Sequence, residues 1–211
     1  MAKSEHIRAV FVGCGRTAWD EAGRVGGACD LPLTPIGLAD AEAELKALAG
    51  VKLSSILTSS DGASRQTAGL VAARVATDGV APRIKLVEGL ADACMGLWEG
   101  MRHAELEEKF PKVYKSWRED PEAVIVPEGE TLVEAQTRIV QALGSCFSRV
   151  NAEGATAVVL RPMALALVRC WLDVAPLRNV WSMVNEAPAL MWRTIPRDQL
   201  RRKPALVRMT A

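Results

Sequence analysis

The alternation of short apolar runs with amphipathic stretches is the feature that most restricts how this chain can fold. Residues 7–12 and 155–160 are rich in β-branched and apolar side chains, which is typical of buried strands. Strands are predicted at 7–12, 53–58, 84–86, 155–160, 190–195 and 205–209. Helices are predicted from Thr34-Pro35 onward and at 64–76, 131–150 and 163–172. This order predicts an α/β fold, a three-layer α/β/α sandwich around a mostly parallel sheet.

The first long helix has a clear start signal. Thr34 is a good N-cap, and Pro35 suits the first helical position because its missing N–H is not needed there. Apolar residues then recur every three or four positions. The apolar stripe of this helix is expected to comprise Leu38, Ala41, Leu45 and Leu48.

The length of 211 residues suits one domain, which is expected to span 1–211. The regular alternation stops at about 89–129, where glycines flank Trp98 and prolines stand at 111, 121 and 127. Aromatic residues in this segment need a core to pack against, so it is interpreted as an excursion from the sheet, a lid or lobe, rather than a linker.

Charge and cysteine usage exclude several classes of protein. The chain has 26 basic and 25 acidic residues, so it has no global field for nucleic acid or a membrane surface. It contains no apolar run of the ~20 residues that span a bilayer, and residues 1–10 lack the apolar core of a signal peptide. The five cysteines form no CxxC pair, so neither a metal site nor a disulfide framework is indicated. A soluble, cytoplasmic protein is expected.

Three loops are expected to meet at one edge of the sheet, because ligands of such folds bind beyond the carboxyl ends of the strands. One loop follows the first strand and carries Cys14 between two glycines, a position at which a nucleophile could be presented. The second covers residues 59–65, and the third follows Leu160.

The residues of these loops resemble those of a known family. GCGRTAWDEAGRVGGACDLPLTPIG, residues 13–37, is similar to the opening motif of the histidine phosphatase superfamily, in its cofactor-dependent phosphoglycerate mutase-like branch. In that family the motif runs Arg-His-Gly-Glu-Thr-x-Trp-Asn, Gly-Arg-x-Gln-Gly and Asp-x-Pro-Leu-Thr-x-x-Gly. The resemblance continues in SRQTA (64–68), GLWEG (96–100), EGETLVEAQTR (128–138) and AVVLRPMALALV (157–168). It implies a phosphoglycerate mutase-like fold.

The resemblance also implies which positions once carried chemistry. In the family a histidine attacks phosphorus, two arginines and a second histidine neutralise the phosphoryl oxygens, and a carboxylic acid protonates the leaving group. The corresponding residues are Gly13 for the first arginine, Cys14 for the nucleophile, Ala63 for the second arginine, Arg161 for the second histidine and Asp92 for the acid. The only histidines, His6 and His103, stand elsewhere in the motif order and are given no catalytic role. We therefore expect the frame of the family without its active centre.

Three functions remain open. The favoured one is a non-catalytic pseudoenzyme that binds a partner or a small anionic or phosphorylated ligand, with Arg16, Thr17, Arg24 and Arg161 as candidate anion-binding residues. The second is a phosphomonoester hydrolase or mutase of altered chemistry that uses Cys14 and Asp92. The third is a structural subunit of an oligomer, with itself or another protein. No cofactor and no metal are implied, and neither nucleic acid nor membrane is an expected partner.

Overall fold

A five-stranded sheet forms the centre of the computed structural model, which describes residues 5–150 and 154–201. The strand order is β3-β2-β4-β1-β5. Three neighbouring pairs, β1/β4, β2/β3 and β2/β4, are parallel, whereas β5 runs antiparallel to β1. The strands are β1 (His6–Gly13), β2 (Leu53–Thr58), β3 (Arg83–Leu86), β4 (Ala155–Leu160) and β5 (Leu190–Pro196). The predicted, mostly parallel sheet is therefore confirmed.

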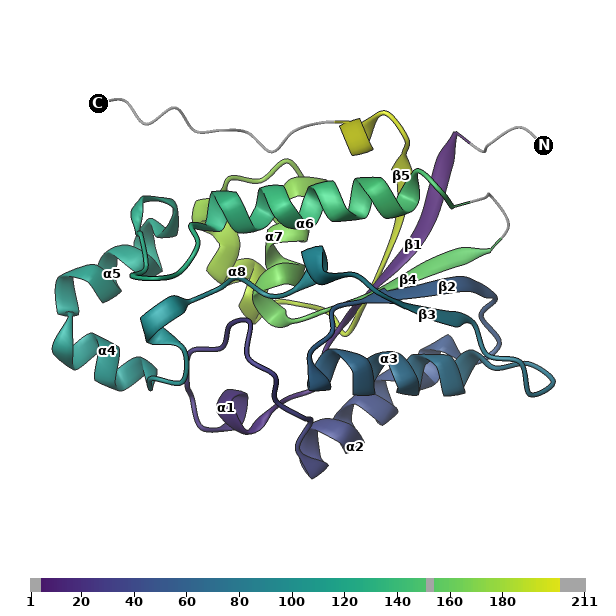
Figure 1. Ribbon diagram of the computed structural model, residues 1–211, viewed down its shortest axis with the longest axis horizontal. Coiled ribbons are helices and arrows are strands. Elements are labelled where there is room, and N and C mark those ends of the chain that lie inside the picture. Colours follow the sequence, from purple (N-terminus) through teal and green to yellow (C-terminus); the bar gives the residue numbers. More distant parts are fainter. Residues whose placement is uncertain (1–4, 151–153, 202–211) are drawn as a thin grey trace.

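Helices cover both faces of the sheet (Figure 1). They are α1 (Ala18–Glu21), α2 (Pro35–Glu44), α3 (Gly62–Val75), α4 (His103–Lys109), α5 (Pro111–Glu119), α6 (Leu132–Phe147), α7 (Pro162–Leu172) and α8 (Val180–Asn185). In Figure 1, α2 and α3 lie below the sheet and α6 and α7 lie above it. The three-layer sandwich is the predicted architecture, and the structure confirms it.

The described residues form two hydrophobic cores, one on each face of the sheet. Both are formed by the same strands, because successive side chains of a strand point to opposite faces of the sheet. Phe11 and Val158 belong to a larger core that includes residues of α6 and α7. Val12 and Val159 belong to a smaller core shared with α3. Every residue of β4 is buried, as expected for a strand between two others with helices on both sides.

The helix ends follow from local sequence. Thr131 forms a capping box with Glu134 at the start of α6, and Asp61 caps α3 through the amide of Ser64. Thr34 caps α2 with Pro35 in its first turn, as predicted.

The predicted apolar stripe of α2 needs a correction. Ala41 is buried, and Leu45 and Leu48 are buried in the 3₁₀ helix that follows, but Leu38 is 39% exposed. The helix packs through Gly37, whose Cα lies so close to the backbone of Arg16 that no side chain would fit. The buried residues of α2 are therefore Gly37 and Ala41, and Leu38, which follows Gly37, lies on the exposed side of the helix.

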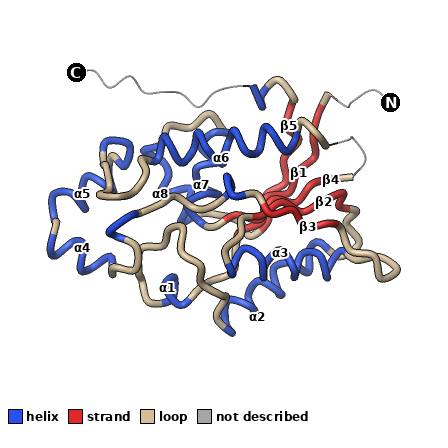
Figure 2. The backbone as a smooth tube through the Cα atoms, viewed as in Figure 1, coloured by secondary structure: helices blue, strands red, loops and turns tan. Residues whose placement is uncertain are grey.

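The segment 89–129 holds α4 and α5, which lie beyond one end of the sheet (Figure 2). Trp98 and Trp117 join the larger core and Tyr114 packs against it, whereas Phe110 is exposed. The ring centroids of Trp98 and Trp117 are 5.2 Å apart, and those of Trp117 and Trp181 are 4.7 Å apart. Among the described residues no helix is long and apolar enough to cross a membrane. The strand predicted at 205–209 lies outside the described residues.

Candidate functional site

The site lies where β1, β2 and β4 end. The backbone amide of Cys14 donates to the carbonyl of Leu160 at 2.9 Å, which ties the loop after β1 to the end of β4. The loop after β2 leads directly into α3, and the loop after β4 leads into α7. The backbone therefore joins the first and third of the expected loops, and hydrogen bonds to the side chains of Ser64 and Thr67 bring the start of α3 to the same place.

Cys14 contacts the start of α3. Its Sγ lies 3.3 Å from Ser64 Oγ, and the neighbouring Ala63 contributes only a methyl group. Burial raises the pKa of the Cys14 thiol to about 12, although the positive charge of Arg161 acts in the opposite direction. The thiol is therefore protonated at neutral pH.

Arg161 is the N-cap residue of α7, and its side chain is only 3% exposed. Its Nη2 donates to Asp20 Oδ2 at 3.1 Å, so its charge is paired inside the protein. Its Nη1 is buried and has no hydrogen-bond partner. Thr17, also buried, donates from its amide (2.7 Å) and its hydroxyl (2.6 Å) to the same Asp20 oxygen. Asp20 is thus held in place to receive the guanidinium.

Asp92 lies buried on the other side of Arg161. Its Oδ1 accepts a hydrogen bond of 2.6 Å from the amide of Ala164, in the first turn of α7. Burial raises the pKa of Asp92 to about 6, against the opposing influence of Arg161. The backbone around Asp92 is fixed by Arg138 of α6, which donates to the carbonyl oxygens of Gly89, Ala91 and Asp92.

The four candidate anion-binding residues do not form one cluster. Arg16 is exposed and paired with Asp40 of α2. The hydroxyl of Thr17 is engaged by Asp20. Arg24 and Arg161 line the same cavity, and Arg24 also donates from Nη1 to the carbonyl of Gly100 at 2.6 Å.

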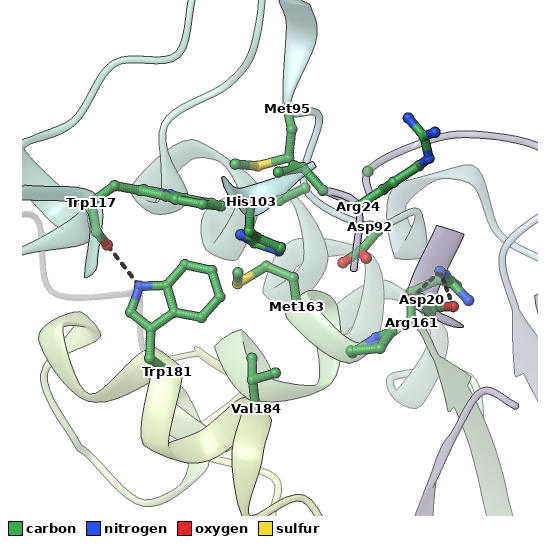
Figure 3. Close-up of a pocket in the computed structure, with 15 residues that line it drawn as sticks. Asp20, Arg24, Asp92, Met95, His103, Trp117, Arg161, Met163, Trp181 and Val184 are labelled. Atoms are coloured by element: carbon green, nitrogen blue, oxygen red, sulfur yellow. Dashed lines mark hydrogen bonds and ion pairs between the residues drawn. The ribbon is translucent and has the colours of Figure 1, made fainter. Parts of the chain in front are cut away.

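That cavity has a volume of about 130 Å³ and two chemically different ends (Figure 3). At one end Asp20, Arg24, Asp92 and Arg161 carry charges. At the other end the wall is formed by His103, Trp117, Met163, Trp181 and Val184. Trp181 Nε1 donates to the carbonyl of Trp117 at 2.7 Å, which joins α8 to α5 across the cavity wall.

The apolar wall is the part of the site that the sequence did not indicate. Trp117 was expected only to pack, and Met163 and Trp181 were given no role. His103 stacks on Trp117 with the ring planes 15° apart, and its Nδ1 lies 3.4 Å from the Tyr114 hydroxyl. Burial and the positive charge of Arg118 lower the pKa of His103, which favours the neutral form of the ring. One signal in the sequence could have indicated this wall. Met163 directly follows the first residue of α7, at the end of the sheet where the site was expected.

Within residues 5–150 and 154–201, no group of three or more His, Cys, Asp or Glu side chains could hold a metal ion. The arrangement offers a buried cation, a buried carboxyl group that can hold a proton near neutral pH, and an aromatic wall. Such a cavity can bind a small molecule that has a polar end and an apolar end.

Comparison with known proteins gives the family. The family model of the histidine phosphatase superfamily (branch 1) matches residues 10–201. "Probable phosphoglycerate mutase GpmB" of Proteus mirabilis is 28% identical over 143 residues, and that of Yersinia pestis is 28% identical over 145 residues. The first match covers 67% of this chain and 64% of that relative, so the likeness spans less than two thirds of the relative's length.

Solved structures agree with this family. Bacillus stearothermophilus YhfR is 29% identical to this chain, with a TM-score of 0.75. The match covers 83% of this chain and 84% of the YhfR chain. The alpha-ribazole phosphatase of Shigella flexneri, 24% identical with a TM-score of 0.69 over the same shares of the two chains, is similar in fold. The chain therefore belongs to branch 1 of the histidine phosphatase superfamily, and its fold is that of the phosphoglycerate mutase-like proteins.

Proposed function

We propose that this protein is a non-catalytic member of its superfamily, a pseudoenzyme that binds a small ligand in the cavity beside Arg161. The environment of Cys14 carries the proposal. By resemblance, Cys14 stands where the family has its nucleophilic histidine. With a pKa of about 12, only on the order of one thiol in 10⁵ is ionised at pH 7, whereas the thiolate is the nucleophilic form.

The charges around Cys14 support the same proposal. Gly13 and Ala63, at the positions of the family's two arginines, carry no charge. Arg16 is held at the surface by Asp40, and Arg161 is neutralised by Asp20. Phosphoryl transfer depends on preorganised positive charge around the transferring group, and this supply is greatly reduced here.

A hydrolase of altered chemistry remains the second candidate, because one observation favours it. Asp92 is a buried carboxyl group with a pKa of about 6, which is suited to a general acid at neutral pH. In this candidate Asp92 protonates the leaving group, and Cys14 is the nucleophile. The thiol state of Cys14 is the argument against it. A protein partner, a homo-oligomer and a cytoplasmic location stay predictions from the sequence.

Turnover of p-nitrophenyl phosphate and of 3-phosphoglycerate separates the two candidates. For a pseudoenzyme we expect the wild-type protein and Cys14→Ala to release product at the same rate as buffer. Turnover by the wild type that disappears in Cys14→Ala would establish the hydrolase and refute the proposal.

A further inference from the structure

A buried donor without an acceptor marks the charged end of the cavity. Arg161 Nη1 is buried and unpaired, although Nη2 of the same guanidinium is bonded to Asp20. Leaving a buried donor unsatisfied lowers stability, and more so when the donor is charged. A ligand with an acceptor at this position would remove that cost.

The opposite end of the cavity suits a flat apolar group. Met163, Trp181 and Val184 line it, and aromatic side chains prefer to contact other rings face to edge or with an offset stack. The volume of about 130 Å³ is close to the ~150 Å³ of an engineered apolar cavity that binds one benzene molecule. The cavity as a whole therefore has room for a ligand with one six-membered ring and not for one with two.

The charge balance favours one negative charge on the ligand rather than two. Two arginines, Arg24 and Arg161, line the cavity together with two carboxylic acids, Asp20 and Asp92. A phosphate monoester carries about 1.5 to 2 negative charges at neutral pH and would face both carboxyl groups. The amide of Ala164 at the start of α7, a usual partner for phosphate, already donates to Asp92.

We propose that the cavity binds a small monocarboxylate that carries a single aromatic ring, with the carboxylate on Arg161 and the ring against Trp181 and Met163. This inference rests on the proposed ligand-binding function and names the class of ligand. It does not depend on whether the ligand has any other substituent, because the cavity is partly open to solvent.

Asp92 makes such an anion easier to accommodate. The groups that act on its charge are Arg161, Asp61 and the backbone amides of Ala93 and Ala164. Because its pKa is already raised to about 6, Asp92 can take up a proton when a second carboxylate arrives beside Arg161. Uptake of this one proton offsets the single negative charge of a monoanion, whereas a dianion would leave one negative charge without compensation.

Matched probes test the ligand class. Phenylacetate and phenyl phosphate share the ring and differ in the charged group, while acetate lacks the ring and benzyl alcohol lacks the charge. Binding is followed by calorimetric titration and by intrinsic tryptophan fluorescence, to which Trp181 and Trp117 of the cavity wall contribute. We expect saturable binding of phenylacetate, with phenyl phosphate, acetate and benzyl alcohol each weaker by at least about tenfold.

Variants locate the binding. Val184→Phe places a larger side chain in the apolar end and is expected to abolish phenylacetate binding. Val113→Phe, a matched change on the exposed surface of α5 outside the cavity, is expected to leave binding unchanged. Arg161→Gln is expected to weaken phenylacetate binding at least about tenfold without changing that of benzyl alcohol. If Arg161→Gln does not fold, the loss of phenylacetate binding in Val184→Phe still shows whether the ligand occupies this cavity.

Absence of phenylacetate binding would overturn the inference, and so would phenyl phosphate that binds as tightly as phenylacetate. Phenylacetate binding that survives Val184→Phe would also overturn it, because the ligand would then sit elsewhere. The proposed function fails by a different measurement, the turnover of p-nitrophenyl phosphate or 3-phosphoglycerate by the wild type and not by Cys14→Ala. A protein that binds phenyl phosphate tightly without turnover refutes the ligand class alone.

Discussion

Replacing Asp92 by asparagine tests the electrostatics of the site. The side chain is buried, its Oδ1 accepts from the amide of Ala164, and its pKa is raised from 3.8 to about 6 by burial. Asparagine keeps the shape and the acceptor oxygen but cannot ionise. Its NH₂ group takes the place of one of the two oxygens near the amides of Ala164 and Ala93, which costs stability by an amount that does not change with pH. A difference between two pH values therefore isolates the ionisation of Asp92.

The sign follows from the direction of the pKa change. The folded-state pKa lies above the unfolded value, so protonation of Asp92 favours the folded state. This contribution is fully present below the unfolded value of 3.8 and is lost as the pH rises through about 6. A rise from 3.8 to about 6 corresponds to about 3 kcal/mol. Most of this free-energy contribution is lost between pH 4 and pH 8. Over that interval the wild type is expected to lose about 2 to 3 kcal/mol relative to Asp92→Asn.

Urea unfolding at pH 4, 6 and 8, followed by tryptophan fluorescence, measures this difference for a two-state domain. Asp120→Asn is the matched control, because the Asp120 side chain is exposed and no buried charge is removed. We expect the free energy of unfolding of Asp92→Asn, relative to wild type, to increase steadily with pH. A relative stability that is flat over this range would mean that Asp92 ionises as an exposed carboxylate does, and one that falls would mean that folding lowers its pKa; either result would refute the reasoning.

Three further predictions concern the neighbouring residues. Alkylation of Cys14 by iodoacetamide at pH 7, followed by peptide mass spectrometry, is expected to be at least about thirtyfold slower in the folded protein than in urea. The rise of its pKa from 9.0 to about 12 lowers the thiolate fraction about a thousandfold, and the higher nucleophilicity of the more basic thiolate offsets only part of this loss. Similar rates in both states would contradict a raised thiol pKa. Asp20→Asn removes the counter-charge of buried Arg161 and is expected to lower the free energy of unfolding by about 3 kcal/mol. This value is the lower end of the range for breaking a buried ion pair, because the Asp20 side chain is 22% exposed. A change below about 0.5 kcal/mol in urea unfolding would show that the ion pair contributes little. Thr131→Ala breaks the capping box of α6 and is expected to cost about 1 kcal/mol by the same measurement, whereas no change would mean that the cap is replaced by water.

Much of the fold could be predicted because local signals agree with tertiary structure. The β-branched run in β1 and β4 is a strong strand signal, and Thr34-Pro35 marks the start of α2. The direction of β5 could not be read, because alternation of strands and helices does not say whether an edge strand reverses. The short α4, α5 and α8 were missed because helices of six to nine residues depend on packing rather than on propensity.

The candidate site divides in the same way. The positions of Cys14, Asp92 and Arg161 followed from the register of the family resemblance, and the structure places them together. The aromatic wall could not be predicted, because it depends on a contact between Trp117 and Trp181 from distant parts of the chain. The pairing of Arg16 with Asp40 was equally hidden, and it removes one of the expected anion-binding residues from the cavity.

The mass of the intact protein after incubation with p-nitrophenyl phosphate tests the central claim most directly. A phosphoryl-transfer enzyme that uses a protein nucleophile passes through a covalent phosphoenzyme, so its mass rises by one phosphoryl group. The account predicts an unmodified mass for the wild type and for Cys14→Ala alike. A phosphoryl adduct on the wild-type protein that maps to Cys14 and is absent from Cys14→Ala would contradict it.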